Sequence, residues 1–226
     1  MTDSSAAMRV TLTFDNGPSV DTTPVVLDLL ADRELAATFF VVGSMLSRPG
    51  ARDLAVRAAA EGHWIGNHSL THAMPLGDDH DPAYAEREIE RTQELLGDLS
   101  HDRRFFRPFG GGGILGPHLF SPAAVDVLRR GRYTCVLWNS VPHDWDDPDG
   151  WVDTALADVK KLEHAVVVLH DLPTGAMTKL PCFLDRLAIA GAEVVQDFPS
   201  EVIPIEGGVP TGAERLEGLV SPAVRA

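Results

Sequence analysis

The chain has 226 residues, of which 44% are hydrophobic, and its formal net charge is −14 at pH 7. This length and apolar content suffice for one large α/β domain and argue against wholesale disorder. The acidity argues against nucleic acids and anionic membrane surfaces as partners, because both carry negative charge. No signal peptide and no apolar run long enough to cross a bilayer stands out in the sequence, so we expect a cytoplasmic protein.

The two cysteines differ in their predicted surroundings. Cys135 lies in an apolar strand-like run and Cys182 lies in a predicted helix. We expect both to be buried free thiols, because a chain of this size does not need a disulfide for stability.

Strand-like and helix-like segments alternate along the chain. Hydrophobic patterning predicts strands at residues 8–14, 36–42, 63–66, 104–108, 133–138, 165–169 and 193–195. It predicts helices at residues 23–34, 51–61, 82–99, 122–130, 151–163 and 178–190. Such alternation is typical of a parallel sheet, and at this length a closed or nearly closed (β/α) barrel with about seven strands is more economical than two domains.

The last part of the chain has a different composition. Residues 200–226 are rich in Gly and Pro and contain no predicted strand–helix unit. We therefore expect a domain at residues 1–199 followed by an extended tail at 200–226, which either packs on the barrel or joins subunits into a homo-oligomer.

Two polar residues stand where the first strand ends. The apolar run at residues 10–14 leads into Asp15-Asn16-Gly17-Pro18, and a predicted helix follows. In parallel α/β folds the functional side chains lie at the carboxyl ends of strands, so Asp15 and Asn16 are candidate site residues. By itself this stretch would favour an ordinary strand-to-helix turn, because Asn-Gly and Gly-Pro pairs are common in turns.

A pair of histidines forms a second candidate. His68 and His72 are four residues apart, a spacing that places two imidazoles on one face of a helix or tight turn. Two such imidazoles suit Zn²⁺ or a similar divalent ion, and the alternative is a pair of structural histidines.

Three later stretches carry further candidates, each with a structural alternative. Arg107 stands at a strand end before four glycines at 110–113 and could orient a carboxylate, although this stretch alone favours a flexible surface loop with an exposed arginine. Asp144 lies in a loop that could be merely a capped turn. His170 directly follows an apolar strand and is expected at the same rim as Asp15, unless it is a structural rim histidine.

Together and in this order, the five stretches resemble the polysaccharide deacetylases of carbohydrate esterase family 4. The family motifs are T-F-D-D-G-P, H-[ST]-x-x-H, R-P-P-[FY]-G, a terminal Asp-Trp, and an apolar residue before His. They correspond here to residues 13–18, 68–72, 107–110, 144–145 and 169–170, with the third motif one residue short. The resemblance spans about residues 8–196 and implies a distorted (β/α) barrel that hydrolyses an N- or O-acetyl group with the help of a metal.

The resemblance implies four catalytic residues. Asp15 corresponds to the general base that deprotonates the attacking water, and His170 to the general acid that protonates the leaving amine. Asp144 corresponds to the partner that keeps His170 cationic, since a nearby carboxylate raises an imidazole pKa. Arg107 corresponds to the partner that holds Asp15 ionised.

The resemblance also implies residues that bind the substrate and a metal. The substrate-binding residues are Phe109, whose neighbouring backbone N–H would face the oxyanion, and Trp145 and Leu169, which would line a pocket for the acetyl methyl group. The metal ligands are His68, His72 and the residue at position 16.

Position 16 departs from the family pattern, which has aspartate where this chain has Asn16. An amide oxygen can bind a metal but brings no negative charge, so this set of ligands is expected to hold a divalent ion more weakly. Zn²⁺ is the favoured ion, with Co²⁺, Ni²⁺ and Mn²⁺ as alternatives, and a metal-free site stays open.

The sequence therefore predicts a hydrolase of a non-peptide carbon–nitrogen bond, acting by metal-dependent deacetylation of an N-acetylated sugar or polysaccharide. One alternative is a metal-independent amidohydrolase that acts on a small linear or cyclic amide. The other is a catalytically silent carbohydrate-binding protein. The expected partner is accordingly an N-acetylated saccharide or a small amide, with no nucleic acid and no membrane.

Overall fold

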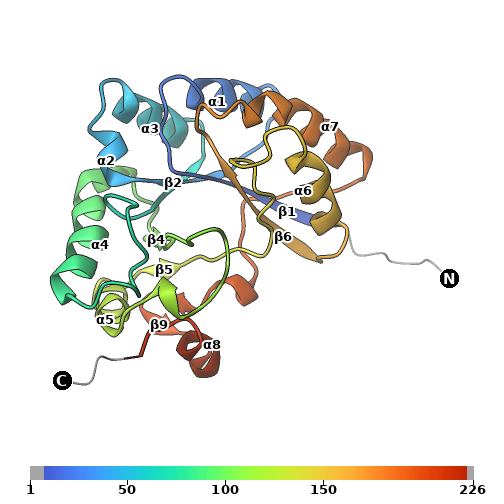
Figure 1. Cartoon of the computed structure of the whole chain (residues 1–226). Coiled ribbons are helices and arrows are strands. Elements are labelled where there is room, and N and C mark those ends of the chain that lie inside the picture. The colour runs from blue at the N-terminus through green and yellow to red at the C-terminus, as the bar shows by residue number, and fades with distance from the viewer. Residues whose placement is uncertain (1–7, 223–226) are drawn as a thin grey trace.

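The fold is a curled, mainly parallel sheet covered by helices. The computed structural model describes residues 8–222, and Figure 1 shows β1, β2 and β6 at the centre of the molecule. The strands are hydrogen-bonded in the order β6-β1-β2-β3-β4-β5-β8-β9, and β7 pairs with β1. Their bounds are Arg9–Asp15 (β1), Thr38–Val41 (β2), Trp64–Asn67 (β3), Phe105–Phe106 (β4), Thr134–Cys135 (β5), His164–His170 (β6), Glu193–Val194 (β7), Ile205–Glu206 (β8) and Val209–Pro210 (β9).

Helices cover the outer face of this sheet. Figure 1 shows α1, α3, α6 and α7 on one side of the molecule, with α4 and α5 beside β4 and β5. The predicted alternation of strands and helices is confirmed, as is the α/β barrel-like class. The α-helices are Thr23–Ala31 (α1), Gly43–Leu46 (α2), Ala51–Ala60 (α3), Pro82–Leu96 (α4), Pro122–Arg130 (α5), Trp151–Val159 (α6), Leu180–Ile189 (α7) and Ala213–Glu217 (α8).

The two faces of β1 differ in character, one being apolar and the other polar. On β1, Val10, Leu12 and Phe14 join the core cluster that includes residues of α1, α6 and α7. The residues that alternate with them, Thr11, Thr13 and Asp15, are polar and also buried. Because successive side chains of a strand point to opposite faces, the polar set lies on the face of β1 that is turned away from those helices.

The barrel is distorted because several strands are short. β4 and β5 contain two residues each, and the chain continues past β5 without a regular ladder. One isolated parallel bridge between Ser140 and Val167 then connects this continuation to β6. Its hydrogen bonds run from the Ser140 N–H to the Val166 carbonyl and from the Val168 N–H to the Ser140 carbonyl, at 3.2 and 3.0 Å.

The C-terminal segment packs on the barrel. Within residues 200–222 the chain forms a short 3₁₀ helix, Ser200–Val202, then β8, β9 and α8. The β8 strand pairs antiparallel with β5 through Cys135 and Ile205. Ile205 and Leu216 are buried in the same core cluster as Cys135, so this segment extends the sheet beyond β5 and packs on its core. The part of the predicted tail after residue 222 lies outside the described residues.

Several details differ from the sequence prediction. Cys135 is buried as expected, but Cys182 is exposed, because it lies on the solvent side of α7; both thiols are free. The helix expected from residue 178 begins as a 3₁₀ turn, Ala176–Lys179, before α7. No helix between residues 8 and 222 combines the length and apolarity that a membrane span requires.

Candidate active site

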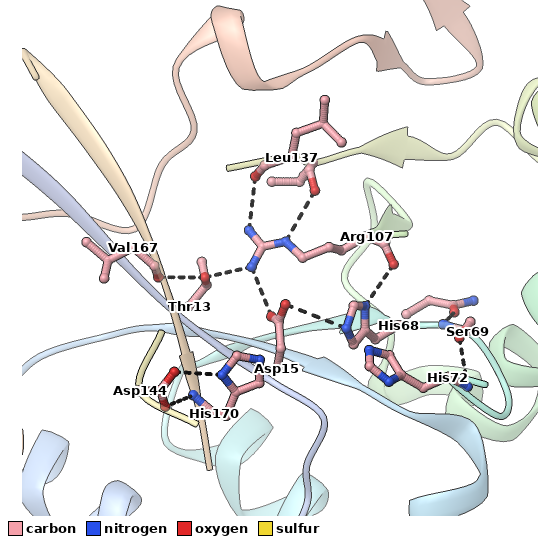
Figure 2. A network of polar contacts seen from close by, with 12 residues as sticks. Thr13, Asp15, His68, Ser69, His72, Arg107, Leu137, Asp144, Val167 and His170 are labelled. Carbon is pink, nitrogen blue, oxygen red and sulfur yellow. Dashed lines mark hydrogen bonds and ion pairs between the residues drawn. The ribbon is translucent and has the colours of Figure 1, made fainter. Parts of the chain in front are cut away.

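The predicted site residues gather at the carboxyl ends of the parallel strands. Asp15 ends β1 and His170 ends β6, and the two are register partners on neighbouring strands. His68 directly follows β3, and Arg107 directly follows β4. Figure 2 shows these side chains converging from segments that are far apart in the sequence. This is the edge of a parallel barrel at which functional side chains are expected.

Arg107 is a buried partner of Asp15. Its side chain is fully buried, and its Nη1 donates hydrogen bonds to Asp15 Oδ1 and Thr13 Oγ1, at 2.9 and 2.7 Å. Its Nε and Nη2 donate to the Val136 and Leu137 carbonyls. A guanidinium whose three nitrogens all donate hydrogen bonds holds one oxygen of Asp15 and fixes its orientation. This rules out the exposed surface arginine that the local sequence favoured.

Arg107 also shows why Thr13 is polar. Thr13 accepts from Arg107 and donates its own hydroxyl to the Val167 carbonyl at 2.7 Å, so it connects β1, β4 and β6 beneath the rim. Sequence reasoning placed no role on Thr13. The signal that could have found it is its position two residues before Asp15, on the same face of the strand.

His170 and Asp144 form a second buried pair. The carboxylate of Asp144 is fully buried and accepts from both the His170 Nδ1 and the His170 backbone N–H, at 2.8 and 2.9 Å. Burial lowers the pKa of His170, but the hydrogen bond and charge of Asp144 outweigh it, and the pKa is raised above its ordinary value. The Trp145 indole packs edge-on against the imidazole, with ring centroids 4.9 Å apart. His170 is therefore held in one orientation with Nε2 free.

His68 presents a free nitrogen to Asp15. Its Nδ1 lies 2.9 Å from the Arg107 carbonyl oxygen, which can only accept, so Nδ1 carries the proton. Its Nε2 lies 3.6 Å from Asp15 Oδ2. Burial, joined by the charge of Arg107, lowers the pKa of His68 to about 3. The imidazole is therefore neutral, with the lone pair of Nε2 available to a ligand or a metal.

His72 lies against His68 on the same turn. The two imidazole centroids are 4.7 Å apart, and the His72 ring also packs on Phe109 at 4.1 Å. Burial and the nearby His68 lower the pKa of His72 to about 3. Both imidazoles are thus neutral, which is the form that binds metal ions.

The residues present fit a divalent metal, but with one neutral ligand in place of a charged one. The side-chain oxygen of Asn16 is buried and has no hydrogen-bond partner, and its backbone has a left-handed φ of 72°. This oxygen is therefore free to bind a cation. Within residues 8–222 no three His, Cys, Asp or Glu side chains are grouped to hold a metal, so a metal here would depend on the Asn16 amide beside the two histidines.

These groups line one cavity of about 340 Å³. Its wall also includes the glycine loop 110–113, whose Gly113 carbonyl accepts from Trp138 Nε1 at 2.8 Å. The volume falls in the range of small-molecule sites. The lining side chains are Asp15, Asn16, His68, His72, Pro108, Phe109, Trp138, Val141, Trp145, Val168 and His170.

One predicted pocket residue is misplaced. Leu169 was expected to line the pocket, but it lies in the core cluster beneath the helices, whereas Val168 lines the cavity. The physical reason is strand alternation. Val168 lies two residues before His170 and therefore on the same face of β6, which faces the cavity, whereas Leu169 points to the opposite face. Trp138 and Val141 were also missed as pocket residues. Trp138 ends the strand predicted at 133–138, of which only Thr134–Cys135 forms β5, and Val141 follows in the irregular segment after it.

The fold and the site define a class: a barrel-like α/β protein in which a carboxylate held by an arginine, Asp15, and an imidazole held by a carboxylate, His170, line one cavity. The sequence profile of the family described as polysaccharide deacetylase matches residues 3–136. The chain therefore belongs to the polysaccharide deacetylase family. It is a deacetylase, a hydrolase that acts on a carbon–nitrogen bond.

Individual relatives agree with this assignment. A chitooligosaccharide deacetylase of Rhizobium leguminosarum bv. trifolii is 35% identical over 171 residues, covering 72% of this chain and 71% of the relative. A family 4 carbohydrate esterase from Streptomyces lividans, solved with acetate, superposes with a TM-score of 0.70 at 27% identity, covering 86% of this chain and 95% of that one. A family 4 acetyl xylan esterase from Clostridium thermocellum, solved with a cobalt ion, gives a TM-score of 0.65 at 27% identity, covering 83% and 87%.

Proposed function

We propose that this protein removes the acetyl group from an N-acetylated saccharide by a metal-dependent hydrolysis centred on Asp15 and His170. The observation that carries the proposal is that Asp15 and His170 line a single cavity, and that each is held from behind by a buried partner of opposite charge, Arg107 and Asp144 respectively. The named relatives act on chitooligosaccharide and on acetyl xylan, which supports a saccharide carrier. Aromatic rings in the wall, from Phe109, Trp138 and Trp145, suit the apolar face of a sugar.

Asp15 is the general base of the proposed reaction. Arg107 occupies Oδ1, so Oδ2 is the oxygen that faces His68 and the cavity. In this arrangement Oδ2 accepts a proton from the attacking water while Oδ1 stays fixed by the guanidinium. The water oxygen then bonds to the acyl carbon.

His170 is the general acid. Its Nδ1 is bonded to Asp144, and this leaves Nε2 to donate a proton to the leaving nitrogen as the carbon–nitrogen bond breaks. The products are acetate and a free amine. Asp144 supports this step in two ways, because it orients the ring and favours the protonated imidazole.

The metal ligands in this proposal are the Nε2 atom of His68, the imidazole of His72 and the amide oxygen of Asn16. A divalent cation supplies polarisation of the acyl carbonyl and acidification of the attacking water. A relative solved with cobalt supports this part of the proposal, and Zn²⁺ is the ion that two imidazoles and one oxygen suit well. The uncharged amide makes the expected affinity lower than that of a His/His/Asp set.

The test is elemental analysis of protein purified without a histidine tag and without chelator, combined with assays on triacetylchitotriose before and after dialysis against a chelator. We expect about one divalent ion per chain after incubation with Zn²⁺, and loss of activity on its removal. Peptide mapping must confirm that Asn16 is still an amide, because conversion to aspartate would supply the usual ligand. Absence of metal after incubation with Zn²⁺, or activity that survives the chelator, would refute metal dependence.

Assays of the same metal-free protein on small amides distinguish a second candidate, which the uncharged Asn16 side chain favours. Without a carboxylate at position 16, the Asp15 and His170 couples could hydrolyse a small linear or cyclic amide without metal. Turnover of such amides by metal-free protein would support that amidohydrolase. Saccharide binding without turnover, unchanged in Asp15→Asn, would instead indicate a catalytically silent binding protein.

A further inference from the structure

A buried glutamate on α4 contacts the turn that carries both candidate metal-binding histidines. Glu88 is only 1% exposed, although ionised carboxylates are seldom fully buried. Its Oε2 accepts from the backbone N–H groups of Leu70 and Thr71, at 3.0 and 2.8 Å. Its Oε1 accepts from the Thr71 hydroxyl at 3.0 Å. All three donors lie between His68 and His72.

The turn needs such support because its backbone is unusual. Ser69 and His72 both have left-handed φ values, 64° and 51°, which side chains other than glycine rarely adopt. Asn67 accepts from the Ser69 N–H at 3.0 Å, and Ser69 Oγ accepts from the His72 N–H at 3.2 Å. These local bonds shape the two ends of the turn, and Glu88 holds its middle.

Helix α4 is built to receive this turn. Asn67 donates to the Ile89 carbonyl at 2.8 Å, and the Tyr84 hydroxyl donates to the Met74 carbonyl at 2.9 Å. Tyr84 and Glu88 are four residues apart and therefore lie on one face of the helix. The chain from residue 67 to residue 74 is thus hydrogen-bonded to α4 at three positions of the helix, residues 84, 88 and 89.

The bonding pattern of Glu88 points to a role in the turn rather than in the helix. Among the described residues, 8–222, the Glu88 carboxylate forms no ion pair, and its hydrogen bonds go only to residues 70 and 71. A buried carboxylate without a cation is unfavourable unless it accepts several hydrogen bonds, which the turn provides. Such outer partners of metal ligands commonly set the orientation of the ligands.

We propose that Glu88 is a positioning residue that holds the imidazoles of His68 and His72 in place for the metal before it binds. This inference rests on the proposed metal site. Preorganisation matters here because Asn16 brings no charge, so a larger share of the affinity depends on the geometry of the two histidines. Glu88 therefore acts on metal affinity through the turn, without touching the metal or the substrate.

The experiment measures Zn²⁺ affinity directly, by competition with a chromophoric chelator, in the wild type and in Glu88→Ala and Glu88→Gln. Removing the carboxylate should weaken Zn²⁺ binding about 10–100-fold, as is typical for outer partners of metal ligands. The glutamine variant should lose less than about fivefold, because its amide oxygen can accept from both N–H groups and its NH₂ can donate to the Thr71 hydroxyl.

The matched control is Glu86→Gln on the same helix. Glu86 is exposed and makes only a long ion pair with Arg130, at 3.8 Å, so its substitution changes the net charge equally without touching the turn. Zn²⁺ affinity should be unchanged in this control. Thermal unfolding of each metal-free variant separates a loss of fold from a loss of preorganisation. If Glu88→Ala does not fold, Glu88→Asp replaces it, since the shorter side chain keeps the charge but withdraws the oxygens from the turn.

The outcomes are distinct. Weaker Zn²⁺ binding by the folded Ala or Asp variant, recovered in the Gln variant, supports the inference. Wild-type affinity in the folded Ala or Asp variant overturns it while leaving the proposed function intact. Failure of the wild type itself to bind Zn²⁺ overturns the proposed metal dependence and the role of Glu88 together.

Discussion

Replacing Asp144 by asparagine should lower the pKa of His170 and thereby shift the pH at which activity is lost. Asp144 is fully buried, the His170 side chain is only 11% exposed, and their contact is 2.8 Å. Burial alone lowers the pKa of His170, and Asp144 is the main group that reverses this. Asparagine keeps one oxygen to accept from the His170 backbone N–H but removes the negative charge.

The size of the shift follows from the lost interaction. A hydrogen bond to a charged group contributes about 1.5–3 kcal/mol. At about 1.4 kcal/mol per tenfold change, this predicts that the protonated form of His170 is disfavoured about 10–100-fold. The general acid must be protonated, so activity is lost as the pH rises through the pKa of His170. Above both pKa values, Asp144→Asn should therefore reduce kcat/KM about 10–100-fold.

The assay is the pH profile of kcat/KM for amine release from triacetylchitotriose, together with a thermal unfolding curve for each protein. The basic limb of the variant should move to lower pH. The matched control is Asp146→Asn, which makes the same charge change at an exposed residue and should leave the limb in place. A basic limb that stays put or moves to higher pH in folded Asp144→Asn would refute the assignment of His170 as the acid.

The same pair makes a prediction about stability. The folded pKa of His170 is raised above the unfolded value of about 6.5. The His170–Asp144 pair therefore contributes fully to the free energy of unfolding at pH values below the unfolded pKa. This contribution is lost as the pH rises through the folded pKa of His170. Asp144→Asn should remove this dependence.

Two further substitutions test the other side of the cavity. Asp15→Asn should reduce kcat about 100-fold or more, because the base is lost, while the protein stays folded, since the amide oxygen can still accept from Arg107; near-normal turnover would contradict the role of Asp15. Asn16→Asp should tighten Zn²⁺ binding at least about tenfold, which is 1.4 kcal/mol, because it adds a charged ligand at a left-handed position that aspartate tolerates. Equal Zn²⁺ affinity in titrations of the two proteins would mean that position 16 does not face the metal.

The sequence by itself determined the class of fold and the edge at which the chemistry gathers. Apolar runs that end in Asp15 and His170 predicted strands with polar residues at their carboxyl ends, and parallel strands bring those ends together. The histidine spacing predicted two imidazoles on one face of a helix or tight turn. These features are local, because strand period, turn chemistry and residue spacing are written in short stretches of chain.

Tertiary structure alone decided which side chains become partners. Arg107 reaches Asp15 across 92 residues of sequence, and its local surroundings favoured an exposed loop, since nothing in the glycine-rich stretch shows what packs over it. The choice of Val168 over Leu169 depends on which face of β6 meets the helices. In the sequence, Glu88 is one of several charged residues in the helix predicted at 82–99. Only the packing of α4 against the histidine turn gives its carboxylate three donors and a role.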